Sequence, residues 1–284
     1  MRPEFLIEAL PYIRQFNAKP FVVKYGGSTM LDEAQFDRVA KDLALIKLVG
    51  INLSVVHGGG KHVNELLAKL NIKNEFKNGL RVTDDETMRI VEMVLSGRSN
   101  KDLVTLINRH GGNAVGLSGK DGPLLRARAY TDADGGTYGR VGIIDSGAVS
   151  ADLIKHMHAG GYMPVISPVA FGEDGGSYNI NADHAAARVA QALRATKLIF
   201  LSDVPGVLRD PNNKDSLITS LSVSEMRALI ADGTISGGML PKIQSIIECL
   251  ENGVEKVHII SGLAPHALLL EIFTDGGVGT VCYA

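Results

Sequence analysis

Two glycine-rich turns are the features of the sequence best suited to bind a charged ligand. Residues 21–27 read FVVKYGG and residues 51–60 read INLSVVHGGG, so each turn follows an apolar run. A β-branched apolar run is typical of a buried parallel strand. Glycines at the carboxyl end of such a strand let backbone N–H groups close around an anion, and a helix that begins there adds its dipole. The two turns therefore predict a site for a phosphate or a carboxylate.

Three charged residues stand where such a site would need them. Lys24 ends the first apolar run, Lys242 lies at the start of a predicted helix, and Asp183 lies in the first turn of another. Two cations and an acid that orients them suit a reaction in which an anion approaches a polyanion, because charge stabilisation then carries most of the catalysis. Taken alone, each residue is also typical of a solvated strand end or helix end.

The elements that must position these residues alternate between strand and helix, which is typical of an α/β protein with a mainly parallel sheet. Helices are predicted over residues 32–48, 63–70, 150–159, 182–194 and 241–252, and further strands over 163–166, 197–201 and 257–260. Between residues 124 and 144 the pattern changes to short segments around Asp134-Gly135-Gly136. This stretch predicts a hairpin that covers or lines the site.

Composition narrows the class of protein. The 284 residues, 45% of them hydrophobic, suffice for about two domains. A net charge of −2 gives no electrostatic footprint for nucleic acid or for an anionic membrane. Cys249 and Cys282 have no metal-binding spacing, and so few thiols fit a reducing compartment, so we expect a cytoplasmic protein. The acidic N-terminal stretch does not resemble a signal peptide, and no apolar run approaches the ~20 residues of a membrane span.

Familiar catalytic motifs are absent from the sequence. It contains neither a P-loop nor a dinucleotide-binding Gly-x-Gly-x-x-Gly after a strand. The HGGG at 57–60 is similar to the oxyanion loop of some esterases, but no Gly-x-Ser-x-Gly elbow accompanies it, which disfavours a hydrolase. The histidines are scattered and form no His-Glu-x-x-His motif, so no protein metal site is predicted.

Six motifs together carry a resemblance that spans the chain. They are KYGGS at 24–28, HGGG at 57–60, NGLRVT at 78–83, NINAD at 179–183, LSDVPGV at 201–207 and GGMLPK at 237–242. In this order they resemble the N-acetylglutamate kinases of the amino acid kinase family. The resemblance implies a three-layer αβα sandwich with a mainly parallel central sheet. It also implies transfer of the γ-phosphoryl group of ATP to the side-chain carboxylate of N-acetyl-L-glutamate, an early step of arginine synthesis.

The resemblance also implies roles for single residues. Lys24 and Lys242 would stabilise the transferring phosphoryl group, and Asp183 would hold both lysines. The residues implied for N-acetyl-L-glutamate are Gly59, Gly60, Arg81 and Asn179, and a planar guanidinium suits a carboxylate independently of the resemblance. Asn181 is left as structural or substrate-adjacent. His57 either orients its glycine turn or is an ordinary satisfied histidine at a strand end.

Nucleotide binding is expected in the C-terminal half, beyond the carboxyl ends of the strands. By the resemblance, the ATP residues are Gly26, Gly27, Asp203, Val204, Pro205, Gly206, Val207, Leu208, Thr234, Ile235 and Ser236. Mg²⁺ is expected to be held mainly by the ATP phosphates and water, so no protein ligand is named for it.

The ends of the chain predict regulation. Residues 3–16 have near-helical apolar spacing, with Pro3 suited to a helix start and Pro11 expected to kink the helix. This extension resembles the arginine-inhibited family members, in which N-terminal helices interlace dimers into a homohexamer. The resemblance places L-arginine beside that helix, at His258, Glu271 and Gly277, and suggests a PII-type protein as a further partner. The alternative is a helix that packs only on its own domain.

We therefore expect an N-terminal extension (1–20), a lobe for N-acetylglutamate and dimerisation (21–195) and an ATP lobe with a C-terminal regulatory segment (196–284). Two other functions stay open. N-acetyl-L-2-aminoadipate is one methylene longer than N-acetyl-L-glutamate, a difference worth only about 1–3 kcal/mol in a pocket. A non-catalytic arginine sensor on the same fold is the other. An aspartokinase fits less well, because too few residues follow Lys242 for its usual regulatory domains.

Overall fold

The computed structural model describes residues 4–26, 32–132 and 134–284. The main strands are β1 (Pro20–Tyr25), β2 (Asn52–His57), β5 (Ala114–Gly119), β6 (Arg126–Thr131), β7 (Thr137–Ile143), β8 (Met163–Gly172), β9 (Ser177–Ile180), β10 (Lys197–Ser202), β13 (Ser220–Ser222), β14 (Lys256–Ser261) and β15 (Thr280–Tyr283). They form one sheet in the order β13-β15-β14-β10-β1-β2-β8-β6-β7-β9, with β5 also paired to β8. The pairs β6–β7, β8–β9 and β14–β15 are antiparallel and the others are parallel. The mainly parallel sheet is therefore confirmed.

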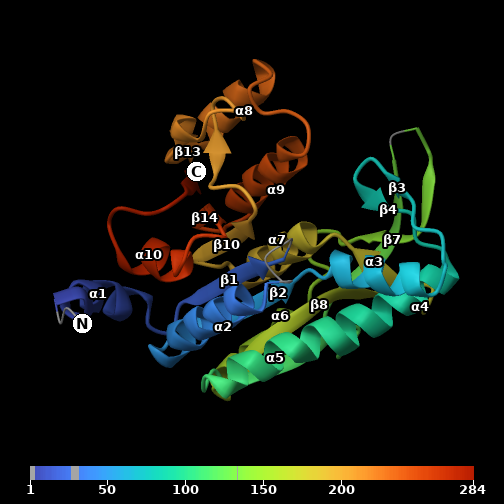
Figure 1. Ribbon diagram of the computed structural model, residues 1–284, viewed down its shortest axis with the longest axis horizontal. Coiled ribbons are helices and arrows are strands. Elements are labelled where there is room, and N and C mark those ends of the chain that lie inside the picture. The colour runs from blue at the N-terminus through green and yellow to red at the C-terminus, as the bar shows by residue number, and fades with distance from the viewer. Residues whose placement is uncertain (1–3, 27–31, 133) are drawn as a thin grey trace.

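Two small hairpins stand apart from this sheet. One pairs β3 (Phe76–Lys77) with β4 (Leu80–Arg81), and the other pairs β11 (Val207–Leu208) with β12 (Leu217–Ile218). The predicted hairpin around residue 135 is present as β6–β7. Its tip and the β3–β4 turn lie side by side at the right of Figure 1, where Lys77 Nζ donates to Asp132 Oδ2 over 2.9 Å.

Helices cover both faces of the sheet. They are α1 (Glu4–Phe16), α2 (Glu33–Leu48), α3 (Gly60–Lys69), α4 (Asp85–Glu92), the π-helix η2 (Met93–Ser99), α5 (Asn100–Arg109), α6 (Ala151–Ala159), α7 (Ala182–Leu193), the short 3₁₀ turn η3 (Lys214–Ser216), α8 (Val223–Ala231), α9 (Met239–Glu251) and α10 (Ala267–Phe273). Side chains of α1, α2, α5 and α10 share one buried cluster, and those of α6, α7, α8 and α9 share another (Figure 1). The architecture is a three-layer αβα sandwich, as predicted.

The alternation of side chains along β1 decides where its lysine points. Phe21, Val23 and Tyr25 belong to the cluster under α2, whereas Val22 belongs to the cluster under α7 and α9. Successive side chains of a strand face opposite sides of its sheet, so Lys24 shares the side of Val22. The sheet therefore directs Lys24 toward the two helices that begin near Asp183 and Lys242.

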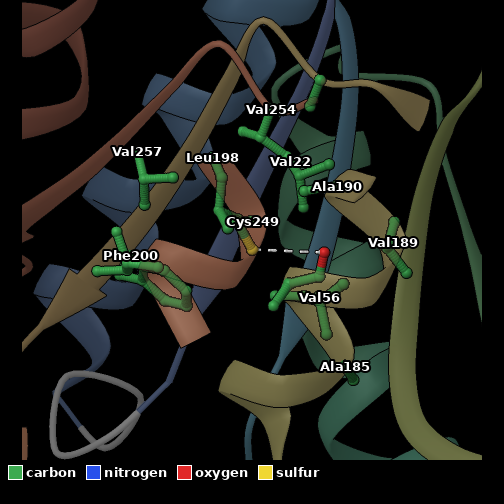
Figure 2. Close-up of a cluster of buried hydrophobic side chains, with 14 of the residues drawn as sticks. Val22, Val56, Ala185, Val189, Ala190, Leu198, Phe200, Cys249, Val254 and Val257 are labelled. Atoms are coloured by element: carbon green, nitrogen blue, oxygen red, sulfur yellow. Dashed lines mark hydrogen bonds between the residues drawn. The ribbon is translucent and has the colours of Figure 1, made fainter. Parts of the chain in front are cut away.

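The packing between α7 and α9 fixes those two helices to each other. Figure 2 shows Cys249 of α9 among Val22, Leu198 and Phe200, with its thiol directed at the backbone of α7. The Cys249 Sγ donates to the Ala187 carbonyl over 3.8 Å. Burial raises the pKa of this thiol to about 12, so it stays protonated and inert. A rigid apolar contact therefore supports the charged residues at the helix starts.

The helices and strands named from the sequence all occur, with ends that differ by a few residues. The structure adds elements that the sequence analysis did not name, chiefly the stretch from α4 through η2 to α5, together with α8 and α10. Pro11 lies inside the helix Glu4–Phe16, and its expected kink stays a prediction; Pro3 lies outside the described residues. In the part of the chain described here, no helix combines the length and apolarity that crossing a membrane requires.

Candidate active site

Three predicted residues meet at the centre of the sheet. Lys24 Nζ lies 2.9 Å from Asp183 Oδ1, and Lys242 Nζ donates to Asp183 Oδ2. Lys24 comes from the end of β1, Asp183 from the first turn of α7 and Lys242 from the first turn of α9. One carboxylate thus bridges two ammonium groups, and the cluster carries a net charge of +1.

The electrostatics of this cluster favour a charged, ordered state. Burial by itself raises the pKa of Asp183, but the charges of Lys24 and Lys242 outweigh burial and lower that pKa to about 2. Both lysine side chains are 14% exposed, and Lys242 Nζ also lies 4.8 Å from the centre of the Phe200 ring. Asp183 therefore stays ionised at neutral pH and holds two cations that can still reach a ligand.

Asn181 supports the same cluster from the helix end. Its side-chain oxygen accepts from the backbone N–H groups of Asp183 at 2.9 Å and His184 at 3.2 Å. This is an N-cap, which satisfies two backbone donors at the start of α7. Asn181 thus caps the helix that carries Asp183, and it also lines the cavity beside Lys242, so a place next to the substrate stays a prediction.

The two glycine turns approach each other beside Lys24. A Cβ atom on Gly26 would lie 3.2 Å from Lys24 Nζ and 3.3 Å from Gly58 Cα, so a side chain at residue 26 would crowd both. Gly59 has a φ of +151°, and a Cβ there would lie only 2.6 Å from Leu95 Cδ2. Glycine is therefore required where the turns meet. Gly27, the other predicted residue of the first turn, lies outside the described residues.

Arg81 is a buried cation with neutral partners. It is 8% exposed, and its guanidinium donates to Asn64 Oδ1 at 2.6 Å, to Asn74 Oδ1 and to the Gly60 carbonyl at 3.2 Å. Within the described residues Arg81 has no carboxylate within salt-bridge distance. Burial lowers its pKa, yet a guanidinium remains charged. A buried charge with only neutral acceptors favours an anionic ligand.

Two of these partners were not predicted. Asn64 lies one helical turn after Gly60 on α3, and Asn74 follows that helix. The spacing of Asn64 from the glycine turn was a usable signal, because residues four apart share a helix face. Asn74 offered none, since its approach to Arg81 depends on the path of a loop.

Asn179 is connected to Arg81 through a buried threonine. The Asn179 Nδ2 donates to Thr83 Oγ1 over 3.2 Å, and that hydroxyl donates to the Arg81 carbonyl over 2.8 Å. The structure therefore brings together Gly59, Gly60 and Arg81, and links Asn179 to them.

A cavity of about 650 Å³ opens beside the lysine cluster. Its lining includes Asn78 and Gly79 from the β3–β4 turn, Asp183 from α7, and Gly238 and Lys242 at the start of α9. The volume suits a ligand of drug size or smaller.

The predicted ATP residues divide into two groups. Thr234, Ile235 and Ser236 directly precede Gly237 and Gly238, which line the cavity. The segment 203–208 does not line it and instead follows β10, with Asp203 and Val204 exposed and Gly206 and Val207 buried. Thr280 anchors this segment, because its hydroxyl accepts from the Val207 N–H at 2.8 Å.

Residues 19–261 match the amino acid kinase family. The chain belongs to the amino acid kinase family. Solved structures with this fold include the N-acetylglutamate synthase of Neisseria gonorrhoeae with coenzyme A and N-acetyl-glutamate, with a TM-score of 0.86 and 27% identity. That match covers 99% of this chain but only 63% of the synthase. The carbamate kinase of Giardia lamblia, with a TM-score of 0.68 and 18% identity, shows a shared fold alone.

Within the amino acid kinase family, this chain is similar to acetylglutamate kinases of several bacteria. The acetylglutamate kinase of Thermoanaerobacter pseudethanolicus is 52% identical to this chain, and the alignment covers 99% of this chain and 92% of that enzyme. The acetylglutamate kinase of Chromobacterium violaceum is 50% identical, and the alignment covers 100% of this chain and 98% of that enzyme. The chain is therefore a phosphotransferase of the acetylglutamate kinase branch, as the sequence motifs predicted.

The three residues predicted to bind arginine gather at a separate cavity of about 440 Å³. Glu271 accepts from His258 Nδ1 at 2.6 Å and from the Val278 N–H at 2.7 Å. A Cβ on Gly277 would lie 3.3 Å from Glu271 Oε2, so only glycine leaves that carboxylate open. Tyr12 of α1 lines the same cavity, which places the N-terminal helix beside it.

Proposed function

We propose that this chain transfers the γ-phosphoryl group of ATP to the side-chain carboxylate of N-acetyl-L-glutamate, an early step of L-arginine biosynthesis. The observation that carries the proposal is the pairing of Lys24 and Lys242 on Asp183 in a chain whose Arg81 lacks an acidic partner among the described residues. The names of the acetylglutamate kinases that cover nearly the whole chain support the same substrate.

The chemistry needs no general base. A side-chain carboxylate with a pKa near ~4.3 is already ionised at neutral pH. The barrier is electrostatic, since this anion must approach the phosphates of ATP. Lys24 and Lys242 supply positive charge where negative charge builds up on the transferring group, and Asp183 keeps both ammonium groups ordered before the substrates arrive.

Arg81 serves the other carboxylate of the substrate. With the side-chain carboxylate at the lysines, the α-carboxylate requires its own cation, and a guanidinium held by Asn64 and Asn74 presents a fixed donor to it. Gly59 and Gly60, at the start of α3, and Asn179, linked through Thr83, complete the proposed substrate contacts.

ATP is proposed to reach the lysines from the C-terminal half. Residues 234–236 and 203–208 would hold the nucleotide, with Gly26 and Gly27 near the transferred phosphate. Mg²⁺ would neutralise phosphate charge and arrive on ATP, because this ion usually keeps several waters and binds the phosphates of the substrate. Closure of the 21–195 and 196–284 lobes would exclude water before transfer.

Trapping the acyl phosphate tests this function and its alternatives. Purified protein with MgATP and hydroxylamine should form a hydroxamate with N-acetyl-L-glutamate, and little with N-acetyl-L-2-aminoadipate, L-aspartate or L-glutamate. A product mainly from the aminoadipate derivative would overturn the assigned substrate. No hydroxamate from any acid would contradict the kinase proposal and favour the sensor.

We also propose feedback inhibition by L-arginine at the cavity of His258, Glu271 and Gly277. The buried Glu271 carboxylate would receive the cationic ligand, and Tyr12 would couple it to α1. Ile7 and Leu10 of α1 are 69% and 50% exposed, which supports burial of this helix in a homohexamer. A PII-type partner stays a prediction.

The variant Glu271→Gln tests the arginine site. It should raise the arginine concentration for half-inhibition at least about tenfold, because the ligand loses a buried charge partner. The kcat without arginine should stay within a factor of two of the wild type, as should that of the exposed control Glu251→Gln. Wild-type activity that is unchanged by arginine up to millimolar concentration would contradict the proposal.

A further inference from the structure

A fully buried polar pair, His57 and Asn100, lies behind the second glycine turn. Both residues are 0% exposed. His57 ends β2, and Asn100 is the first residue of α5, directly after the π-helix η2. Neither side chain is among the proposed contacts of the substrate or the nucleotide. Buried polar groups of this kind are costly unless every donor and acceptor is matched.

The neighbours of Asn100 fix which way its amide is oriented. One end donates to the Val165 carbonyl at 2.9 Å, which is able only to accept. The other end accepts from Lys101 Nζ at 2.9 Å, which is able only to donate. The nitrogen of Asn100 is therefore the atom that lies 3.0 Å from His57 Nε2.

This orientation selects one tautomer of His57. Because Asn100 donates to Nε2, that nitrogen is the acceptor and the proton of the neutral ring is on Nδ1. Nδ1 lies 2.6 Å from the Gly58 carbonyl and donates to it. Burial lowers the pKa of His57 to about 4, which keeps the ring neutral at physiological pH.

The hydrogen bond from His57 to Gly58 holds the glycine turn 58–60 in place, and we call His57 and Asn100 together the clamp. The Gly58 N–H donates to the Tyr25 carbonyl at 2.7 Å, so both backbone polar groups of Gly58 have partners. The next residue is held by packing, since a Cβ on Gly59 would lie 2.6 Å from Leu95 and 2.9 Å from Ser99 Oγ of η2. The turn is thus fixed between β1, β2 and the π-helix.

We propose that Asn100 and His57 are positioning residues, which hold the glycine turn 58–60 in the conformation that binds N-acetyl-L-glutamate. The proposal rests on the proposed function for the identity of the ligand. The proposal also explains the place of the π-helix η2. Such turns occur frequently at functional sites, and this one ends directly before Asn100. Neither residue touches the reacting groups, so their loss weakens binding of the acid more than turnover.

Steady-state kinetics of matched variants test the clamp. His57→Leu removes the donor to Gly58, and we expect KM for N-acetyl-L-glutamate to rise about tenfold, with kcat and KM for ATP within about threefold of wild type. His57→Asn, which keeps an N–H donor near the position of Nδ1, should restore most of the binding. His158→Leu is the control, since His158 is also buried but bonds Ser54 and the Leu53 carbonyl instead. An unchanged KM in His57→Leu, or an equal rise in His158→Leu, would overturn the proposal.

A second measurement does not depend on activity. Nitrogen-15 NMR of the histidine-labelled wild-type protein should give His57 a protonated Nδ1 and an unprotonated Nε2. Asn100→Asp places an acceptor at Nε2, so that nitrogen should become protonated. An Nε2–H tautomer in the wild type contradicts the clamp, even if the protein proves to act on a different acid. If the wild type is inactive but His57 has the expected tautomer, the proposed function is contradicted and the hydrogen bonds of the clamp are supported.

Discussion

The variant Lys242→Met is expected to lower kcat for hydroxamate formation by about 10²–10³-fold, the range typical for loss of one preorganised charge in an active site. KM for N-acetyl-L-glutamate should change by less than about threefold, since Arg81 is still present to bind the acid. Lys24→Met should behave in the same way. The reason is the shared carboxylate: each lysine removed leaves Asp183 with one partner and lowers the net charge of the cluster from +1 to zero.

A surface lysine provides the control for these two variants. Lys155 is 61% exposed and, among the residues that the structure describes, pairs with Asp152 alone, one helical turn away, so Lys155→Met should keep wild-type kcat. Circular dichroism of all three variants checks that the fold is retained. A Lys242→Met enzyme with normal fold and kcat within fivefold of wild type would show that the cluster is structural.

The second large effect is expected at Arg81. Arg81→Leu should raise KM for N-acetyl-L-glutamate about 10²–10³-fold, as expected when one partner of a buried charge pair is removed. Arg81→Lys should recover only part of this loss, because an ammonium is unable to reproduce the hydrogen bonds of a planar guanidinium to Asn64 and Asn74 as well as to a ligand. KM for ATP should remain near its wild-type value in both variants.

Arg128→Lys is the matched control for that series. Arg128 makes a two-point contact with Asp145, at 2.7 Å and 3.0 Å, but its side chain is 53% exposed and it does not line the cavity beside Lys242. It should leave KM for both substrates unchanged. If Arg81→Leu raised KM for ATP and left KM for the acid unaltered, the guanidinium would have to be reassigned to the nucleotide.

Much of the fold was predictable because its signals are local. The apolar run of β1 and the glycines after it reveal a buried strand and its turn, and the proline near the start of α9 marks the helix that carries Lys242. The lysine cluster was implied by the resemblance to the N-acetylglutamate kinases, which groups Asp183 with two cations far away in sequence. The structure supplies the meeting of their side chains, while their catalytic role stays a prediction.

The rest depends on contacts that spacing does not encode. Asn100 reaches His57 only because η2 ends beside β2 and the Val165 carbonyl orients the amide. Asn74 reaches Arg81 through a loop. Likewise, the sequence grouped residues 203–208 with the active site, but it gave no means of telling that this segment lies outside the lining of the cavity at Lys242.

The position of the phosphoryl group on the acid tests the proposed function most sharply. N-acetyl-L-glutamate has two carboxylates, and we propose that the side-chain carboxylate lies at Lys24 and Lys242 and the α-carboxylate at Arg81. Mass spectrometric fragmentation of the hydroxamate formed from N-acetyl-L-glutamate and MgATP distinguishes the two products. We expect the side-chain hydroxamate alone. The α-hydroxamate, or ATP turnover with no hydroxamate, would contradict it.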